Sequence, residues 1–63
     1  MFRVGKCYQH TSGEMMRIIG TVHSTLYGIT MLAEVPGEAF RPIDYLSDVN
    51  WVEISDEGWE DRF

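Results

Sequence analysis

The stretch Tyr8–Gly20, YQHTSGEMMRIIG, decides how this chain folds. Thr11-Ser12-Gly13 in its middle is typical of a turn, because glycine adopts positive φ without a steric cost. From Glu14 to His23 every second position is apolar or small: Met16, Ile18, Gly20 and Val22. This alternation indicates a strand, and the glycine and the β-branched residues disfavour a helix. The stretch therefore predicts a β-hairpin whose second strand turns Met16, Ile18 and Val22 toward the core.

A further strand is predicted from Leu26 to Val35. Its alternation places one set of residues on a single face: Tyr27, Ile29, Met31, Ala33 and Val35. We expect Ile29 and Met31 to reach the core, and Gly28 to permit a bulge or a sharp bend. Val35-Pro36-Gly37-Glu38 then has proline and glycine at the positions that a type II turn requires.

The last third of the chain predicts shorter elements. Ala39 to Arg41 is expected to form a brief strand that ends at Pro42, and residues 43–48 to include a short helical turn. Trp51 to Ile54 is the last predicted strand, with Val52, Ile54 or both in the core. Ser55 can then cap a terminal turn or helix. About five short strands separated by turn signals are typical of a small sandwich or barrel.

Length and composition limit what the chain can be. Its 63 residues form at most one domain, and a chain this short buries only about 60% of the surface that its unfolded form exposes. A hydrophobic fraction of 44% argues against disorder, and a single cysteine allows no intrachain disulfide and suits a reducing compartment. We therefore expect the chain to gain stability by forming a dimer, with the strand edge near Leu26 to Val35 as one candidate contact.

The charge distribution argues against nucleic-acid binding. The net charge is −5, and the run from Glu53 to Asp61 carries five acids and no base: Glu53, Asp56, Glu57, Glu60 and Asp61. Such a segment repels phosphate backbones. The alternative is that the segment is only a solvated face.

Two short motifs resemble other proteins. The run Gly5–Gly13, GKCYQHTSG, followed by Arg17-Ile18-Ile19-Gly20, resembles the opening of a family of short bacterial proteins that begin G-K-x-Y-x-H-x-x-G. The ending Asn50–Trp59, NWVEISDEGW, resembles the W-x-E-I-S ends of small phage and prophage proteins. Together the motifs cover about a third of the chain. The resemblance implies an SH3-like β-barrel and a phage origin, and it implies no catalytic role for any residue.

The expected fold is thus mostly β: one small domain over residues 1–63, built as an SH3-like barrel or a strongly bent antiparallel sheet of about five strands. A short C-terminal helical turn is expected to follow. No apolar run approaches the ~20 residues of a membrane helix. We therefore expect a cytoplasmic protein, in the host cytoplasm if a phage encodes it.

Cysteine and histidine in the opening stretch raise the question of chemistry. Cys7, His10 and His23 could supply three zinc ligands and Glu14 a fourth, but the paired spacing of structural zinc sites is absent. Cys7 and His10 differ by three positions on one strand, so their side chains point to opposite faces and the thiol lacks a base. We predict no metal, no cofactor and no enzymatic activity, with Cys7 packed as a small apolar group.

Surface recognition remains, in two forms besides a purely structural role. The first hypothesis is an acidic binding module that modulates a host protein through C-terminal residues: Trp51, Glu57, Trp59, Glu60 and Asp61. The alternative is an oligomeric small-ligand binder or sponge for a nucleotide signal. In that reading, Arg17 and Arg41 meet on one sheet face to hold phosphates, and Tyr27 stacks on the base.

Overall fold

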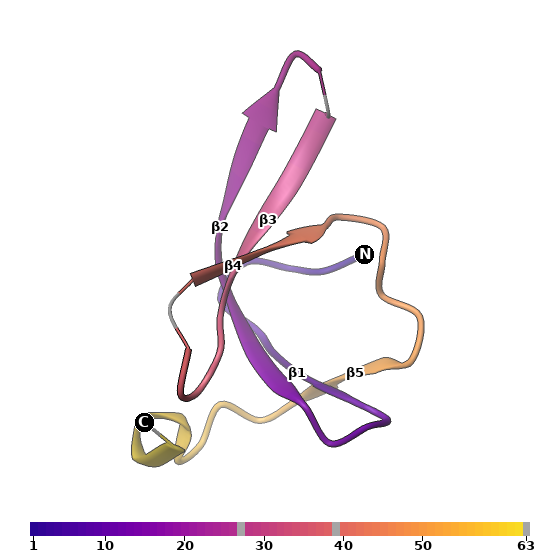
Figure 1. Cartoon of the computed structure of the whole chain (residues 1–63). Coiled ribbons are helices and arrows are strands. Elements are labelled where there is room, and N and C mark those ends of the chain that lie inside the picture. The colour runs from indigo at the N-terminus through magenta and orange to yellow at the C-terminus, as the bar shows by residue number, and fades with distance from the viewer. Residues whose placement is uncertain (27, 39, 63) are drawn as a thin grey trace.

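The computed structural model describes residues 1–26, 28–38 and 40–62, which form one five-stranded antiparallel sheet (Figure 1). The elements are β1 (Cys7–His10), β2 (Met15–Ser24), β3 (Gly28–Glu34), β4 (Phe40–Asp44), β5 (Trp51–Ile54) and the 3-10 helix η1 (Trp59–Arg62). Their spatial order is β4-β3-β2-β1-β5. The expectation of a mostly β chain with five strands is confirmed. The sheet stays open because β4 and β5 are its two edges, so an SH3-like barrel is not confirmed.

Two turns form as their sequences predict. In the β1–β2 hairpin, Gly13 has a φ of 96° and its N–H donates to the carbonyl oxygen of His10 at 2.8 Å. After β3, Gly37 has a φ of 82°, and the N–H of Glu38 donates to the carbonyl oxygen of Val35 at 3.0 Å. Both glycines adopt a backbone conformation that other residues reach only with strain.

The hydrophobic core lies on one face of the sheet, which we call the inner face. Its buried side chains are Phe2, Tyr8, Met16, Ile18, Met31, Ala33 and Val35. The N-terminal arm contributes Phe2, whose ring packs edge-on against Tyr8 with centroids 5.0 Å apart. Met16, Ile18 and Met31 were expected in the core, and each has an exposed fraction of 1% or less.

A β-bulge in β2 reverses the alternation of this strand. Ile18 pairs with Ala33 and Gly20 pairs with Leu32, so Ile19 is an extra residue without a partner on β3. After the bulge Thr21 pairs with Met31 and takes the inner face. The prediction that Val22 is a core residue is therefore wrong: its exposed fraction is 53%. An extra residue shifts every later side chain to the other face.

The other expected core positions are exposed or only half-buried because of their place in the sheet. Ile29 shares the inner face with Met31, but the β2–β3 hairpin projects beyond the rest of the molecule (Figure 1), and Ile29 is 39% exposed. On the edge strand β5, Val52 is 63% exposed and Ile54 is half-buried. Tyr27 lies outside the described residues.

Three further expectations about strands and turns are wrong. Pro42 does not end a strand but lies inside β4, where an edge strand tolerates its missing N–H. In place of the helical turn predicted in residues 43–48, β4 continues to Asp44, and a turn follows in which the N–H of Ser47 donates to the carbonyl of Asp44. Strand β3 pairs with β2 and β4, so it offers no free edge. Across the described part of the chain, no helix has the length and apolarity needed to cross a membrane.

Candidate functional site

A row of paired residues crosses all five strands on the outer face of the sheet, opposite the core. From β5 to β4 the row consists of Ile54, Cys7, Arg17, Glu34 and Phe40. Side chains that pair directly across antiparallel strands lie about 5 Å apart. The strand register therefore brings a thiol, a guanidinium and a carboxylate together, although they are distant in the sequence.

The helix η1 covers part of this row through Trp59, which is only 2% exposed. The indole N–H of Trp59 donates to Oε1 of Glu34 at 2.9 Å, and Arg17 donates to the same oxygen at 2.9 Å. The guanidinium also lies 5.8 Å from the centroid of the Trp59 ring, and it reaches Glu60 at 3.4 Å. Charge-assisted hydrogen bonds and a cation–π contact thus hold η1 on the sheet.

Cys7 is buried below this cluster, with an exposed fraction of 1%. Burial raises the pKa of the thiol, while the positive charge of Arg17 acts in the opposite direction. His10 lies on the inner face, where its ring packs against Trp51 at 5.0 Å and its Nδ1 contacts the Ser12 hydroxyl. The predicted separation of Cys7 from His10 is confirmed. Among the described residues, no group of three or more histidine, cysteine or carboxylate side chains could hold a metal ion.

The residues predicted for partner binding divide into two groups. The carboxylates of Glu57, Glu60 and Asp61 are exposed. Trp59 is buried, so the expectation of an exposed contact residue is wrong, and Trp51 is half-buried against Phe2 and His10. The acids are available to a partner, whereas the tryptophans serve to pack the domain.

The arginines predicted for anion binding do not meet. Arg17 pairs with Glu34 on the outer face, whereas Arg41 pairs with Ala33 on the inner face. Arg41 donates to Glu14 and, at 2.6 Å, to Glu38, and these hydrogen bonds raise its pKa. The expectation that Arg17 and Arg41 share one face is therefore wrong. The third residue of that hypothesis, Tyr27, is not among the described residues.

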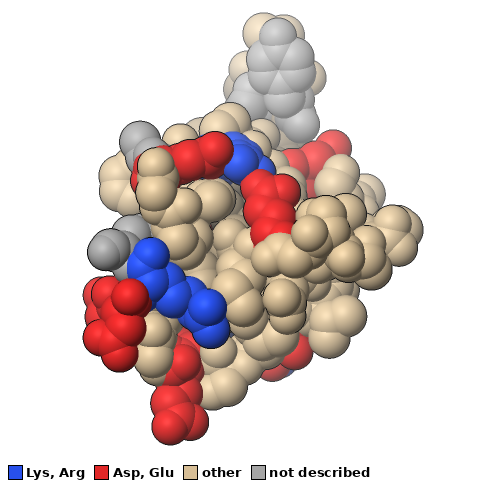
Figure 2. All heavy atoms as spheres, turned by 60° about the horizontal axis from the view of Figure 1, so that its bottom comes forward, with Lys and Arg blue, Asp and Glu red and all other residues tan. Residues whose placement is uncertain are grey.

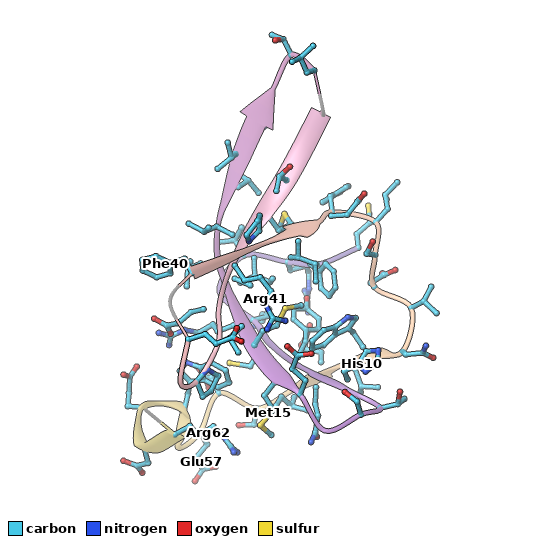
Figure 3. All side chains as sticks on the ribbon, in the orientation of Figure 1. His10, Met15, Phe40, Arg41, Glu57 and Arg62 are labelled. Carbon is cyan, nitrogen blue, oxygen red and sulfur yellow. The ribbon has the colours of Figure 1, made fainter. Side chains whose placement is uncertain are left out.

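An apolar surface that the sequence did not predict lies on the outer face of β2, β3 and β4. We call it the outer strip, and it consists of Ile19, Val22, Leu32, Phe40 and Pro42. Exposed fractions are 36% for Ile19, 53% for Val22 and 63% for Phe40. Figure 3 shows Phe40 pointing outward from the start of β4, whereas Arg41 points toward the middle of the molecule. The strip lies beside the part of the row that η1 covers.

Gly20 is the sequence signal that could have revealed the outer strip. An isolated glycine inside a strand often marks a bulge, and here it follows the extra residue Ile19 directly. A bulge or a sharp bend was expected at Gly28 instead. Gly28 begins β3 after the turn, with a φ of 75°.

Acids lie at both ends of the outer strip. At one end Asp44 pairs with Thr30, in the same row as Val22. A shallow hollow of about 350 Å³ adjoins it, lined by Ile29, Thr30, Pro42, Ile43 and Asp44. At the other end lies the Arg17–Glu34–Glu60 cluster, in which the Glu60 side chain is 81% exposed. Figure 2 shows blue basic groups lying next to red acidic ones on the face that includes the C-terminal end.

The outer face thus combines a buried cluster below η1, an exposed apolar strip and carboxylates at each end of the strip. It offers contact surface and electrostatic attraction, and Cys7, its nucleophilic group, is buried. Comparisons of the chain with protein-family models, with curated proteins and with solved structures found no match.

Proposed function

We propose that this chain is a non-enzymatic protein-binding module whose partner carries a basic surface. The supporting observation is the contrast between three arginines that are held in ion pairs and the exposed acids of the C-terminal segment. Arg3 pairs with Glu53, and Arg17 and Arg41 each contact two carboxylates. Within the described residues, the acids of the C-terminal segment that remain without an ion pair are Asp56, Glu57 and Asp61. These solvated charges can steer a basic partner toward the module.

The resemblance to short bacterial and phage proteins adds the rest of the proposal. It suggests a phage or prophage accessory protein that modulates a host protein in the host cytoplasm. The binding chemistry does not depend on this origin.

The small-ligand hypothesis has less support. A phosphate would have to displace carboxylates from Arg17 or Arg41, and these arginines lie on opposite faces of the sheet. A single arginine that already contacts two carboxylates is a poor anion site. A nucleotide sponge therefore remains the second hypothesis, without an observation of its own.

The test compares partner capture by two variants of equal net charge. Glu57→Gln, Glu60→Gln and Asp61→Asn together remove three negative charges from the C-terminal segment. Thr11→Lys, Thr21→Lys and Thr25→Lys add three positive charges at exposed positions elsewhere. Immobilised wild type and both variants are exposed to the same cell lysate, and bound proteins are quantified by mass spectrometry.

We expect at least one basic protein that binds the wild type and the threonine variant but is depleted on the acid variant. An equal loss on both variants would indicate attraction by net charge alone and would contradict the proposal. Recovery of nucleotides instead of a protein, or the absence of any specific protein, would also contradict it.

A further inference from the structure

We infer that the outer strip is the docking site of the module, and that it receives an apolar protein surface with lysine or arginine beside it. The inference rests on the proposed function and names the surface and the chemistry of the partner. The apolar residues of the strip lie outside the C-terminal acids, and of those acids only Glu60 borders the strip.

The strip is an exposed and continuous apolar surface. Val22 and Phe40 are apolar and more than half exposed, and Ile19 is exposed beside them. Leu32 and Pro42 connect them across the paired strands β3 and β4. Contiguous exposed apolar patches on small soluble domains mark interaction sites, whereas single exposed residues need no explanation.

The strip rests on paired strands that are backed by the core. Its residues stand on paired strands, and behind Leu32 and Pro42 the inner face packs Ile18, Met31 and Ala33 with almost no exposure. A site on a sheet backed by a packed core keeps its shape when a partner binds. The bulge at Ile19 creates the site, because it turns Val22 from the core to the outer face.

The acids at the two ends determine the chemistry of the partner. Asp44 lies at one end, and Glu60 is exposed at the other. The hollow beside Asp44 has apolar walls from Pro42 on the outer face and from Ile43 on the inner face. It therefore lies where the two faces meet at the edge strand β4, and it fits an apolar side chain whose neighbour is basic. Charge complementarity of this kind favours a partner with lysine or arginine on both sides of an apolar centre.

The same acids argue against a second copy of the chain on the strip. In a twofold dimer each end of one strip faces an end of the other, and both ends are acidic. Either orientation would bring carboxylates together between two chains of net charge −5. Like charges across an interface disfavour association.

The probe for this inference is a displayed library of random linear peptides, selected on the immobilised wild-type chain. We expect the selected peptides to be enriched in apolar residues with lysine or arginine nearby. One selected peptide is then titrated into the isotope-labelled chain, and amide shifts are followed by nuclear magnetic resonance. The largest shifts should fall on β2 after the bulge, on β3 and on β4.

Two identical substitutions on the same face provide the matched control. Val22→Thr lies in the strip, whereas Val52→Thr lies on β5, where Val52 is 63% exposed. We expect Val22→Thr to weaken the peptide about threefold and Phe40→Ser about tenfold or more, and Val52→Thr to leave the affinity unchanged.

Several results would overturn the inference: no selected peptide, no enrichment in basic residues, shifts centred on β5 or η1, or equal effects of the two valine variants. Concentration-dependent shifts of the strip residues without peptide would show that a second copy covers the strip, and would overturn it too. The proposed function fails separately, because the capture experiment with the acid variant and the threonine variant tests it. Acid-dependent capture of a protein that tolerates Phe40→Ser would keep the proposed function and remove the strip.

Discussion

At the scale of single residues, Cys7 illustrates how the strand register decides the chemistry of a side chain. It pairs with Arg17 on the outer face, below the segment that carries Trp59. A neighbouring guanidinium favours the thiolate, but burial acts more strongly and raises the pKa. Cys7 is therefore a packing residue, although a cysteine beside an arginine suggests a nucleophile when it is viewed in isolation.

We predict that the Cys7 thiol reacts slowly while the chain is folded. Ellman's reagent should modify the native protein far more slowly than the protein in urea, because the reagent reaches a thiol of 1% exposure only after local opening. The Cys7→Ser variant should fold and lose about 1 kcal/mol of unfolding free energy. Equal reaction rates in the native and unfolded protein would contradict this account.

The raised pKa of Cys7 also predicts how stability depends on pH. The folded state holds the thiol proton more tightly than the unfolded state, so the stabilisation is complete below the pKa of the thiol in the unfolded state. It is lost as pH rises above that value through the folded pKa. Urea unfolding of wild type at rising alkaline pH should show this loss relative to Cys7→Ala. Parallel curves for the two proteins would show that Cys7 makes no contribution.

The bulge predicts that substitutions at two nearby β-branched residues change the unfolding free energy by very different amounts. Val22→Thr should change the unfolding free energy by no more than about 0.5 kcal/mol, because Val22 faces solvent. Ile18→Thr should cost about 3 kcal/mol, because it leaves a cavity and buries a hydroxyl in the core. Urea unfolding measures both values. Similar losses for both variants would mean that β2 has no bulge and that Val22 is buried.

At the scale of elements, local sequence was sufficient where local chemistry sets the geometry. The turn at Gly13, the turn at Gly37 and the strand Trp51–Ile54 were predicted as they form. The bulge at Ile19 was not predictable by alternation, since it exists only in the pairing with β3. Pro42 lies in a strand because β4 is an edge, and an edge is a property of the sheet rather than of the segment.

The site follows the same division. The C-terminal acids are exposed. This could be expected from the sequence alone, because charged side chains are rarely buried. The burial of Trp59 depends on a hydrogen bond to Glu34, which is 25 positions away. The outer strip depends on the bulge and on the pairing of three strands. Sequence reasoning therefore identified the charges of the surface but not its apolar part.

The attachment of η1 to the sheet can be tested at Trp59. Trp59→Phe keeps an aromatic ring but loses the indole donor to Glu34, and should cost about 1 kcal/mol. Trp59→Ala also removes the buried ring and should cost about 3 kcal/mol or more. Both losses are measured by urea unfolding. Because Trp59 lies against Arg17, the strand partner of Cys7, we expect Trp59→Ala in addition to accelerate labelling of the thiol at urea concentrations that leave the sheet folded.

Neutral effects of both tryptophan variants would mean that η1 does not pack on the sheet. A loss for Trp59→Ala without faster labelling of Cys7 would mean that another segment protects the thiol. Leu26→Ala is a suitable control, because Leu26 is an 82% exposed apolar residue at the projecting hairpin, remote from η1.

At the scale of the whole molecule, the small size of the core leads us to predict that the chain forms a dimer. A domain of 63 residues without a disulfide has little stability in reserve. Of the two sheet edges, β4 contains Pro42 whereas β5 has no proline, so β5 is the edge that we expect to pair. Sedimentation at high micromolar concentration should show a dimer. A monomer at that concentration would contradict the prediction.

The division of the surface into acids and outer strip predicts a division of binding kinetics. Once a partner is captured, neutralising Glu57, Glu60 and Asp61 should slow association and reduce its dependence on salt, because exposed charges mainly steer the encounter. Phe40→Ser should instead accelerate dissociation about tenfold or more, because an apolar contact acts in the formed complex. Surface plasmon resonance at several salt concentrations separates the two rates.

The nucleotide hypothesis predicts the opposite result for the same set of variants. Removing acids would leave an anionic ligand bound equally well or better, whereas Arg17→Ala or Arg41→Ala would abolish its binding. For a protein partner, Arg41→Ala should matter little, because Arg41 lies on the inner face with Glu14 and Glu38. Arg17 is a less selective probe, since it also holds Trp59 in place. Binding measurements on Arg41→Ala and Phe40→Ser, two neighbouring positions of β4, therefore decide between the two functions. Loss of binding in Arg41→Ala supports a nucleotide, and loss in Phe40→Ser supports a protein partner.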